Sequence, residues 1–302
     1  MRSTRPGPLT LAAFALVVVV GGSNFVAVRL SNRELPPFYG AGVRFALASV
    51  LLIGIGAVAR TRMPRGRGLA GAAAFGAVNF FADYAFFYWG LQKVPAALGG
   101  VVFGTVPLLT FVLAIAQRQE RFRWRGVIGA AIATGGVVVM VGAPGSPHVP
   151  FVYLAAIVIS AIGAAEGAIL LKHFPDVHPI PLNAVAMSVG TVLLLVLSAI
   201  SGERWLVPQH AATWWALAYL APIGSVGLFI GYVYVVQKWT ASGASYQFVL
   251  FPIVTALTGA LIVDEPLSAA IAVGGALAII GTYAGALAGA EKPEVAPVEP
   301  VS

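Results

Sequence analysis

The sequence contains no cysteine among its 302 residues, and only 10% of its residues are charged. The absence of cysteine excludes disulfide bonds, thiolate catalysis and thiolate metal sites. The low charge, together with 59% hydrophobic residues and a mean hydropathy of +0.90, lies outside the range of soluble globular domains. The composition therefore predicts an integral membrane protein with no soluble domain.

Motifs for several other kinds of chemistry are also missing. The sequence has no Gly-Lys-Ser/Thr loop for phosphates, no paired-histidine metalloprotease motif and no serine nucleophile elbow. Its four histidines are scattered through predicted connections: His148, His173, His178 and His210. We therefore expect no metal site, no cofactor and no enzymatic activity. The net charge of +7 does not indicate a nucleic-acid partner, because the basic residues lie between hydrophobic runs, where they set membrane topology.

Continuous hydrophobic runs fill most of the chain. A helix needs about 20 apolar residues to cross a hydrocarbon core of roughly 30 Å, and uninterrupted runs favour helices over barrel strands. The expected fold class is an all-α integral membrane protein with ten transmembrane helices. Their predicted ranges are 10–30, 38–59, 69–91, 95–117, 124–142, 151–172, 179–201, 211–236, 241–262 and 268–289.

A tandem duplication organises this chain. Residues 92–136 are partly repeated 145 positions later without a gap, and the matching residues are Gln92 and Gln237, Lys93 and Lys238, Pro107 and Pro252, Glu120 and Glu265, Gly129 and Gly274, and Gly136 and Gly281. Each copy, 9–142 and 151–289, holds five predicted spans. Because five is odd, the second copy enters the membrane upside down, which predicts two inverted five-helix repeats around a central cavity. Inverted repeats permit alternating access and so favour a transporter; the alternative is that duplication only enlarged the fold.

The basic residues predict the orientation of the chain. When connections are assigned alternately to the two sides, one side receives both termini and thirteen of the 18 Lys and Arg residues, and the other side receives four. The positive-inside rule then places both termini in the cytoplasm. Residues 290–302 are rich in proline and glutamate and are predicted to form a disordered cytoplasmic tail.

Charged residues inside predicted spans are the first candidates for a site, since each costs about 2.5–3.5 kcal/mol at mid-span. Arg44 and Asp83 fall at similar depth in the outer half of their spans and are able to pair. Asn24 and Asn79 would complete a polar cluster around them. The pair is either a structural link between two helices or part of a solute site or gate.

Glu166 is the third charged candidate, in the inner half of the sixth predicted span. No basic residue lies inside the membrane at its depth, so it is a better candidate than Asp83 for reversible protonation or for binding a cation. The alternative is a glutamate that faces a hydrated vestibule.

Polar aromatic residues and prolines complete the candidate set. Residues expected to line an amphipathic cavity are Tyr84, Tyr88, Glu166, Tyr232, Tyr246 and Gln247. The tyrosine hydroxyls in particular need partners in hydrocarbon. Pro107 and Pro252 occupy equivalent mid-span positions, where each is predicted to kink a helix and act as a hinge.

These features resemble the EamA-type branch of the drug/metabolite transporter superfamily. The resemblance covers residues 9–289 and rests on the opening motif Gly22-Ser23-Asn24-Phe25-Val26-Ala27, on Arg44, and on the spacing of Pro107 from Glu120 and of Pro252 from Glu265. It implies ten helices around a central cavity and export of amino acids, metabolites or toxic compounds across the bacterial inner membrane. Gly21 departs from the pattern, since many relatives carry tryptophan there.

We therefore expect a gradient-driven secondary carrier, or a facilitative one, that moves a small amphipathic metabolite outward, with amino acids as the first choice. The alternatives are a multidrug or quaternary-cation efflux carrier and, in another class, a non-transporting membrane scaffold or an enzyme. Expected partners are a small-molecule solute, the lipid bilayer and protons as a coupling ion. The protein is expected to be a monomer or a homodimer.

Overall fold

The computed structural model describes residues 7–117, 124–142, 149–171, 173, 177–238, 241–265 and 267–284, and every regular element within them is a helix. The elements in chain order are α1 (Pro8–Ser31), α2 (Pro37–Val58), α3 (Arg67–Phe75), η1 (Gly76–Asp83), α4 (Tyr84–Gly90), α5 (Ala96–Phe103), α6 (Val106–Ala116), α7 (Trp124–Gly142), α8 (Phe151–Leu171), α9 (Pro179–Ile200), α10 (Ala211–Leu220), η2 (Pro222–Gly227), α11 (Leu228–Lys238), α12 (Ala241–Val263) and α13 (Ala269–Thr282).

Seven helical segments are long and apolar enough to cross a membrane. They are Pro8–Ser31, Pro37–Val58, Arg67–Gly90, Ala96–Leu113, Phe151–Leu171, Pro179–Ile200 and Ala211–Lys238. Three shorter apolar helices also occur in the described part of the chain: Trp124–Met140, Gln247–Val263 and Ala269–Thr282. The prediction of an all-helical, multi-pass architecture is thus confirmed. Residues 285–289 of the last predicted helix and the predicted tail, 290–302, lie outside the described residues.

The fourth predicted helix differs from its prediction. A continuous helix with a kink at Pro107 was expected, but α5 ends at Phe103 and α6 begins at Val106. Proline lacks a backbone N–H and is tolerated in the first turn of a helix, where that group needs no partner. Pro107 therefore starts a new helix and does not bend an existing one, whereas Pro252 does lie inside α12 as expected.

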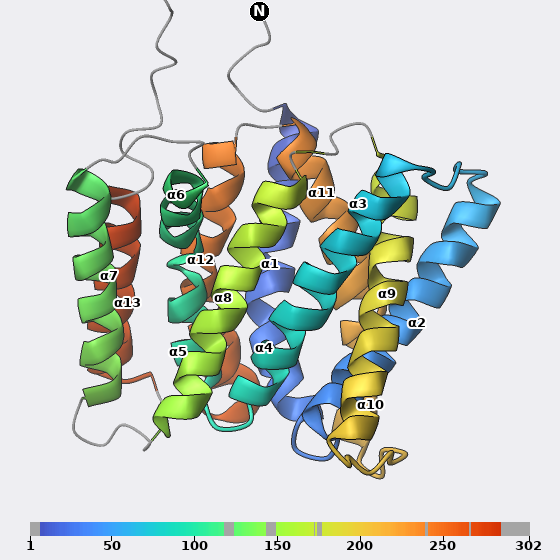
Figure 1. The fold of residues 1–302 in the computed structure, drawn as a ribbon. Coiled ribbons are helices and arrows are strands. Elements are labelled where there is room, and N and C mark those ends of the chain that lie inside the picture. Colours follow the sequence, from blue (N-terminus) through green and yellow to red (C-terminus); the bar gives the residue numbers. More distant parts are fainter. Residues whose placement is uncertain are drawn as a thin grey trace, which may run out of the picture.

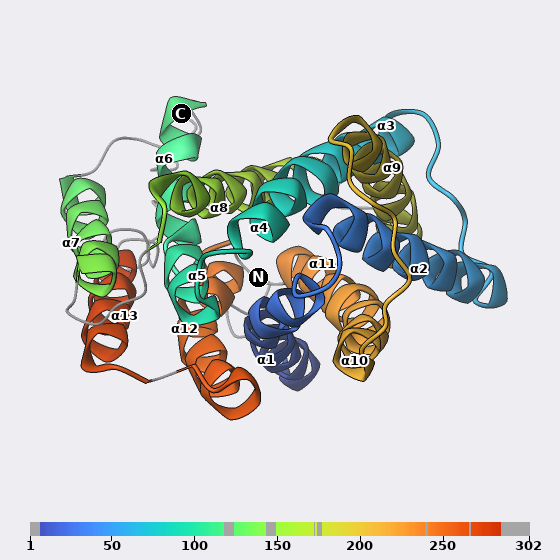
Figure 2. The same cartoon turned by 90° about the horizontal axis from the view of Figure 1, so that it is seen from below.

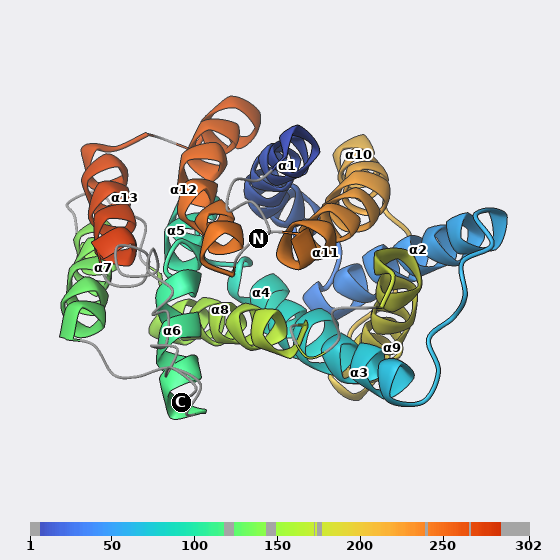
Figure 3. The same ribbon diagram turned by 90° about the horizontal axis from the view of Figure 1, so that it is seen from above.

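The helices stand side by side in a broad bundle (Figure 1). Views along the bundle show α7 and α13 paired at one edge and α2 beside α9 at the opposite edge (Figures 2 and 3). Between these edges lie α1, α4, α5, α8, α11 and α12. The helices of the two halves of the chain are interleaved and do not form separate lobes.

Glycines bring α7 and α13 into close contact. A Cβ atom added to Gly136 would lie 2.4 Å from the carbonyl oxygen of Gly274, and one added to Gly281 would lie 2.6 Å from that of Gly129. Such distances leave no room for a side chain, which is how small residues let helices approach in membranes. Residue numbers rise along one helix as they fall along the other, so α7 and α13 are antiparallel.

Two helices contain a π-helical segment in mid-span. The third long segment contains η1, and Ala211–Lys238 contains η2. A shift of η1 by the repeat offset of 145 positions gives residues 221–228, which enclose η2. The π-turn frees backbone groups and is frequent at functional sites. The structure therefore carries this irregularity at equivalent positions of both halves.

Three glutamates join the two halves on the face opposite the N-terminus, which is the lower face in Figure 1. Glu203 accepts hydrogen bonds from the N–H groups of Phe38 (3.1 Å) and Tyr39 (2.8 Å) at the start of α2.

The other two glutamates act in the same way. Glu265 accepts from Ala96 and Ala97 at the start of α5 and pairs with Arg29 at 2.5 Å. Glu34 accepts from the backbone N–H groups that precede α10, those of residues 209 and 210. Carboxylates are favourable at helix N-termini, so each of the three stabilises a helix of the other half.

Candidate functional site

A pocket lies at the centre of the bundle and is lined from both halves of the chain. The cavity volume of this pocket is about 60 Å³, which suits a small solute. The lining residues are Val17, Gly21, Asn24, Phe25, Asn79, Asp83, Tyr84, Phe87, Phe103, Ala164, Leu228, Phe229, Tyr232, Gln247, Phe248 and Phe251. Six residues predicted for the site are among them: Asn24, Asn79, Asp83, Tyr84, Tyr232 and Gln247.

Asp83 is the acidic group of this pocket. It ends η1, and its carboxylate accepts a 2.5 Å hydrogen bond from the hydroxyl of Ser160 on α8. Gly163, one turn further along α8, lets η1 approach, since a Cβ added there would lie 3.0 Å from Asp83 Cβ. The second carboxylate oxygen of Asp83 has no hydrogen-bond partner among the described residues and is available to a solute.

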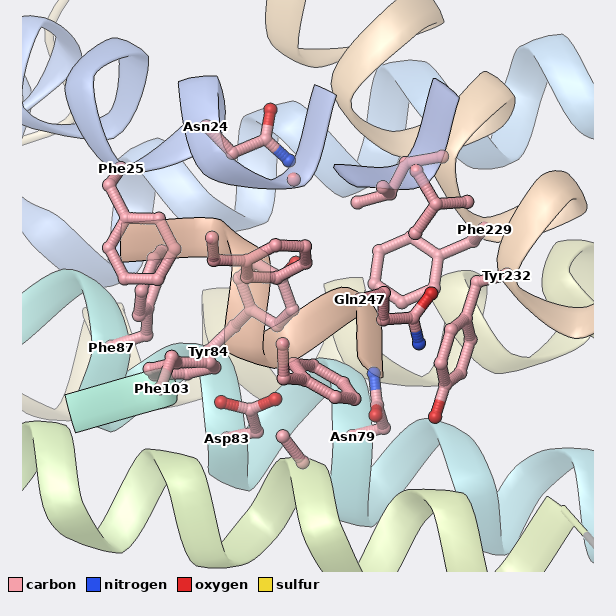
Figure 4. A pocket seen from close by; sticks show the side chains of 16 residues that line it. Asn24, Phe25, Asn79, Asp83, Tyr84, Phe87, Phe103, Phe229, Tyr232 and Gln247 are labelled. Atoms are coloured by element: carbon pink, nitrogen blue, oxygen red, sulfur yellow. The ribbon is translucent and has the colours of Figure 1, made fainter. Parts of the chain in front are cut away.

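Amide and phenol groups lie on one side of Asp83 (Figure 4). Gln247 is 1% exposed and its Oε1 has no partner, while Asn79 Oδ1 points toward α8 at Gly167. Figure 4 shows the amide nitrogens of Gln247 and Asn79 and the hydroxyl of Tyr232 on this same side. This polar side of the pocket therefore offers donors next to the carboxylate.

Aromatic rings fill the other side of the pocket. Phe25 packs edge-on against Phe87 at 4.9 Å, against Phe103 at 5.2 Å and against Phe251 at 6.4 Å between ring centroids. These rings come from four different spans, and Tyr84 extends the cluster toward Asp83 (Figure 4). Phe229 and Phe248 also pack against Tyr232, at 6.2 and 6.3 Å between ring centroids, so aromatic rings surround the polar groups of the pocket.

Arg44 is fully buried but lies behind the pocket wall. Its Nε donates to the hydroxyl of Ser225 (2.7 Å) and its Nη2 to the carbonyl of Gly224 (2.7 Å), both in η2. Its guanidinium carbon lies 5.1 Å from the ring centroid of Tyr84, which lines the pocket. Arg44 is therefore held by η2 and does not reach a solute directly.

The suggested ion pair between Arg44 and Asp83 does not form. Each is occupied by a neutral partner, Arg44 by the hydroxyl and carbonyl of η2 and Asp83 by Ser160. The reason is the π-segment η2, which turns a backbone carbonyl toward α2. The Nδ2 of Asn24 binds the same Gly224 carbonyl at 2.9 Å, so η2 organises two of the predicted residues.

Two further candidates lie outside the lining of this pocket. Tyr88 is fully buried, and its hydroxyl accepts a 3.5 Å hydrogen bond from Arg44. Glu166 accepts a 2.7 Å hydrogen bond from Gln117 Nε2. The side chain of Tyr246 lies outside the described part of the structure.

Several lining residues were missed by reasoning from the sequence. They include Phe25, Phe103, Phe229 and Phe251. Ser160, which holds Asp83 from outside the lining, was missed as well. Gly21 was noted only as a departure from a family pattern, yet a Cβ added there would lie 2.4 Å from the ring of Phe251. The Phe251 ring therefore occupies the space next to Gly21, a relation that the sequence does not reveal.

The comparison with known proteins agrees with this architecture. The EamA-like transporter family matches the chain twice, over residues 9–142 and 151–284. The chain belongs to this family. Its relatives are named as transporters or efflux pumps and not as enzymes, and the chain is a membrane transporter of the same family.

Three relatives illustrate the family. The inner membrane transporter YedA of Escherichia coli, itself uncharacterised, is 28% identical over 275 residues, which cover 89% of this chain and 87% of the relative. A probable terminal-alkyne amino-acid exporter of Streptantibioticus cattleyicolor is also 28% identical over 275 residues, with 89% and 90% covered. A probable amino-acid metabolite efflux pump of Escherichia coli is 28% identical over 298 residues, with 93% and 94% covered.

A solved structure supports the fold. A crystal structure that is 19% identical in sequence superposes with a TM-score of 0.68 and covers 94% of this chain and 99% of its own. At this identity the similarity concerns the fold alone.

Proposed function

We propose that this protein exports small amino acids with apolar side chains through the central pocket. The observation that carries the proposal is the combination of groups in the lining: the carboxylate of Asp83, the donors of Gln247, Asn79 and Tyr232 on one side of it, and phenylalanine rings around them. An amino acid has the same three parts. Its ammonium group would bind Asp83, its carboxylate the neutral donors, and its side chain the aromatic rings.

Transport would proceed by alternating access of two inverted five-helix halves, 9–142 and 151–289. The antiparallel contact of α7 with α13 supports this, since the contacts of Gly136 with Gly274 and of Gly129 with Gly281 exchange under the repeat offset. The equivalent π-segments η1 and η2 are the second support. Two halves related in this way can open the same site first to one side and then to the other.

The proposed location is the bacterial inner membrane, with both termini in the cytoplasm and with protons as the coupling ion. The names of the relatives and the excess of basic residues on the N-terminal side support the location. Asp83 is the carboxylate that we propose to couple protons to solute, because among the acidic residues that the structure describes it alone lines the pocket.

A counterflow experiment tests the solute class. Proteoliposomes loaded with unlabelled leucine should accumulate labelled leucine, because exchange across the carrier needs no net driving force. Competition then separates the chemical groups: leucine should compete, whereas N-acetyl-leucine, which lacks the ammonium, and leucine methyl ester, which lacks the carboxylate, should compete at least about 10-fold less, the effect of about 1.4 kcal/mol.

The second candidate function is export of organic cations. The specific observation in its favour is that the lining contains one carboxylate, eight aromatic rings and no basic residue, and aromatic faces bind cations. If leucine methyl ester and tetraphenylphosphonium compete while leucine does not, the protein exports organic cations and not amino acids. Folded protein that exchanges no solute of either class would contradict both.

A further inference from the structure

A basic groove lies between the connection from α2 to α3 and the start of α9. Both segments lie on the face that carries the N-terminus (Figures 1 and 3). Thr61, Arg62 and Arg65 line it from the first half of the chain, and Val177 and His178 from the second. The volume of the groove is about 370 Å³. The groove is separate from the central pocket and shares no residue with it.

The arginines of this groove have no partner among the residues that the structure describes. Arg62 and Arg65 are exposed, and neither forms an ion pair or a side-chain hydrogen bond there. No acidic side chain contributes to the described lining. Two guanidinium groups thus face a groove whose described residues supply no counter-charge.

The opposite face of the protein shows what fills the corresponding place there. The helices α2 and α9 end in the same turn: Arg60 (φ 51°) follows α2 and Gly202 (φ 69°) follows α9. In each turn, the backbone N–H of the next residue donates a hydrogen bond to the carbonyl five residues earlier. Thr61 donates to Gly56 (2.9 Å) and Glu203 to Ser198 (3.0 Å). Thr61 and Glu203 therefore hold equivalent positions.

These equivalent residues act differently. Glu203 reaches across to the start of α2 and accepts two N–H hydrogen bonds, which links the halves. Thr61 instead donates its hydroxyl to Gly56 of its own helix. The start of α9 could not receive a carboxylate in the same way, because Pro179 and Pro181 have no N–H and that of Ile180 already binds His178 Nδ1. The protein therefore has anionic links on one face and a cationic groove on the other.

We propose that this groove binds the phosphodiester headgroup of an anionic phospholipid, held by Arg62 and Arg65. Guanidinium groups match phosphate oxygens with two parallel hydrogen bonds. The surroundings identify a lipid and not a free phosphate, because large apolar side chains stand exposed beside the groove: Val58 is 87% exposed, Met63 54% and Leu69 45%. Acyl chains would cover these residues, and the headgroup would link the first half of the chain to α9.

Native mass spectrometry of the full-length protein tests the proposal. Protein purified in detergent is titrated with phosphatidylglycerol and, separately, with zwitterionic phosphatidylethanolamine. We expect preferential retention of phosphatidylglycerol by the wild type. Each arginine near a membrane surface strengthens anionic-lipid binding by about 5-fold, so Arg62→Gln with Arg65→Gln should weaken it by roughly 30-fold.

A matched variant and a soluble anion complete the experiment. Arg33→Gln with Arg204→Gln removes two exposed arginines from the opposite face and should leave lipid retention within about 2-fold of the wild type. Glycerol phosphate at millimolar concentration should not displace the lipid. Equal retention by the wild type and the Arg62, Arg65 double variant would overturn the proposal, and displacement by glycerol phosphate would assign the groove to a soluble anion. Unchanged gel-filtration and circular dichroism profiles verify that the variants are folded.

Discussion

Asp83 and Glu166 are two buried or half-buried carboxylates with different surroundings. Asp83 faces the central pocket with one free oxygen, and Ser160 fixes the other. Glu166 turns toward Gln117 and lies away from the lining. The order of the two as candidates for proton coupling is therefore the reverse of the order expected from the sequence, where Asp83 was expected to be paired with Arg44.

The first prediction compares these two residues in counterflow and in proton-driven transport. Asp83→Asn should reduce leucine exchange at least about 100-fold, since one lost charge-assisted hydrogen bond to the ammonium and the unmet charge together cost roughly 3 kcal/mol. It should also remove the dependence of net transport on pH. Glu166→Gln should retain both activities within a few-fold. A pH dependence that survives in Asp83→Asn and is lost in Glu166→Gln would return the coupling role to Glu166.

Glu34 provides a pH prediction at the lower face. The hydrogen bond from the Gln209 N–H lowers the pKa of Glu34 from its ordinary 4.5 to about 2. A lowered pKa means that the ionised form stabilises the folded protein at any pH above 4.5, and that this stabilisation disappears as the pH falls from 4.5 toward 2.

The second prediction follows from the lowered pKa of Glu34. Glu34→Gln should lower the melting temperature of the detergent-solubilised protein by the same amount at pH 7 and pH 5.5, and the difference from the wild type should shrink below pH 4.5. Arg33→Gln, at the exposed neighbouring position, should show no such pH dependence. A difference that already disappears between pH 7 and pH 5.5 would contradict the lowered pKa.

Reasoning from the sequence found the polar residues of the pocket more readily than its apolar ones. Asp83, Asn24 and Asn79 are conspicuous because polar groups inside a membrane are costly and rare. Phenylalanines carry no such signal, since both lipid and pocket accept them, and Phe25 looks no different in sequence from a lipid-facing residue. The hydrogen bonds of Arg44 could not be predicted, because they depend on carbonyls that a π-turn redirects.

At the scale of elements, the long apolar helices were predictable and their interruptions were not. Hydrophobic length locates spans such as Pro37–Val58 and Pro179–Ile200. The segments η1 and η2 pack against helices of the other half. Pro222 starts η2, but no corresponding proline marks η1, so the sequence does not identify the two as a pair. Even Pro107, which was expected to mark a bend, leaves open whether a helix kinks or restarts.

The contact between α7 and α13 gives the third prediction. Gly136→Ala places a Cβ atom 2.4 Å from the Gly274 carbonyl oxygen, a backbone atom that cannot rotate away. Overpacking of this kind costs about 1–3 kcal/mol, and we expect a lower melting temperature. Gly135→Ala is the matched control, because nothing lies within 4 Å of the added Cβ. Equal stability of the two variants would show that α7 and α13 do not pack as described.

At the scale of the whole molecule, the two halves are held together unequally on the two faces. Three glutamates close the lower face, and Glu265 binds two N–H groups of α5 and the guanidinium of Arg29. In the proposed alternating-access cycle, these links would separate when the pocket opens to this face. The charge of Glu265 should therefore favour the conformation that is closed on the lower face.

The fourth prediction measures this effect. The chain has no cysteine, so a single one introduced at Leu228 in the pocket lining reports access without background labelling. Glu265→Gln should increase the rate of its modification by a membrane-impermeant maleimide applied to the lower face by about 5- to 10-fold, which corresponds to roughly 1–1.4 kcal/mol. Asp264→Asn, at the exposed neighbour in the same connection, should leave the rate unchanged. A rate that is the same in all three proteins would contradict the role of Glu265.

The glutamate links also bear on the order of events during synthesis. The backbone N–H of Phe38 donates to a glutamate that lies 165 residues further along the chain, and the N–H of Ala96 donates to one 169 residues further. Neither acceptor exists when the donor is synthesised. Water at the membrane surface must solvate these helix ends until the ribosome has made the second half. The first half thus enters the bilayer before the glutamates that bind its helix N-termini on the lower face have been made. A ribosome that stalls near residue 200 would leave a nascent chain whose helices are inserted but lack these hydrogen bonds.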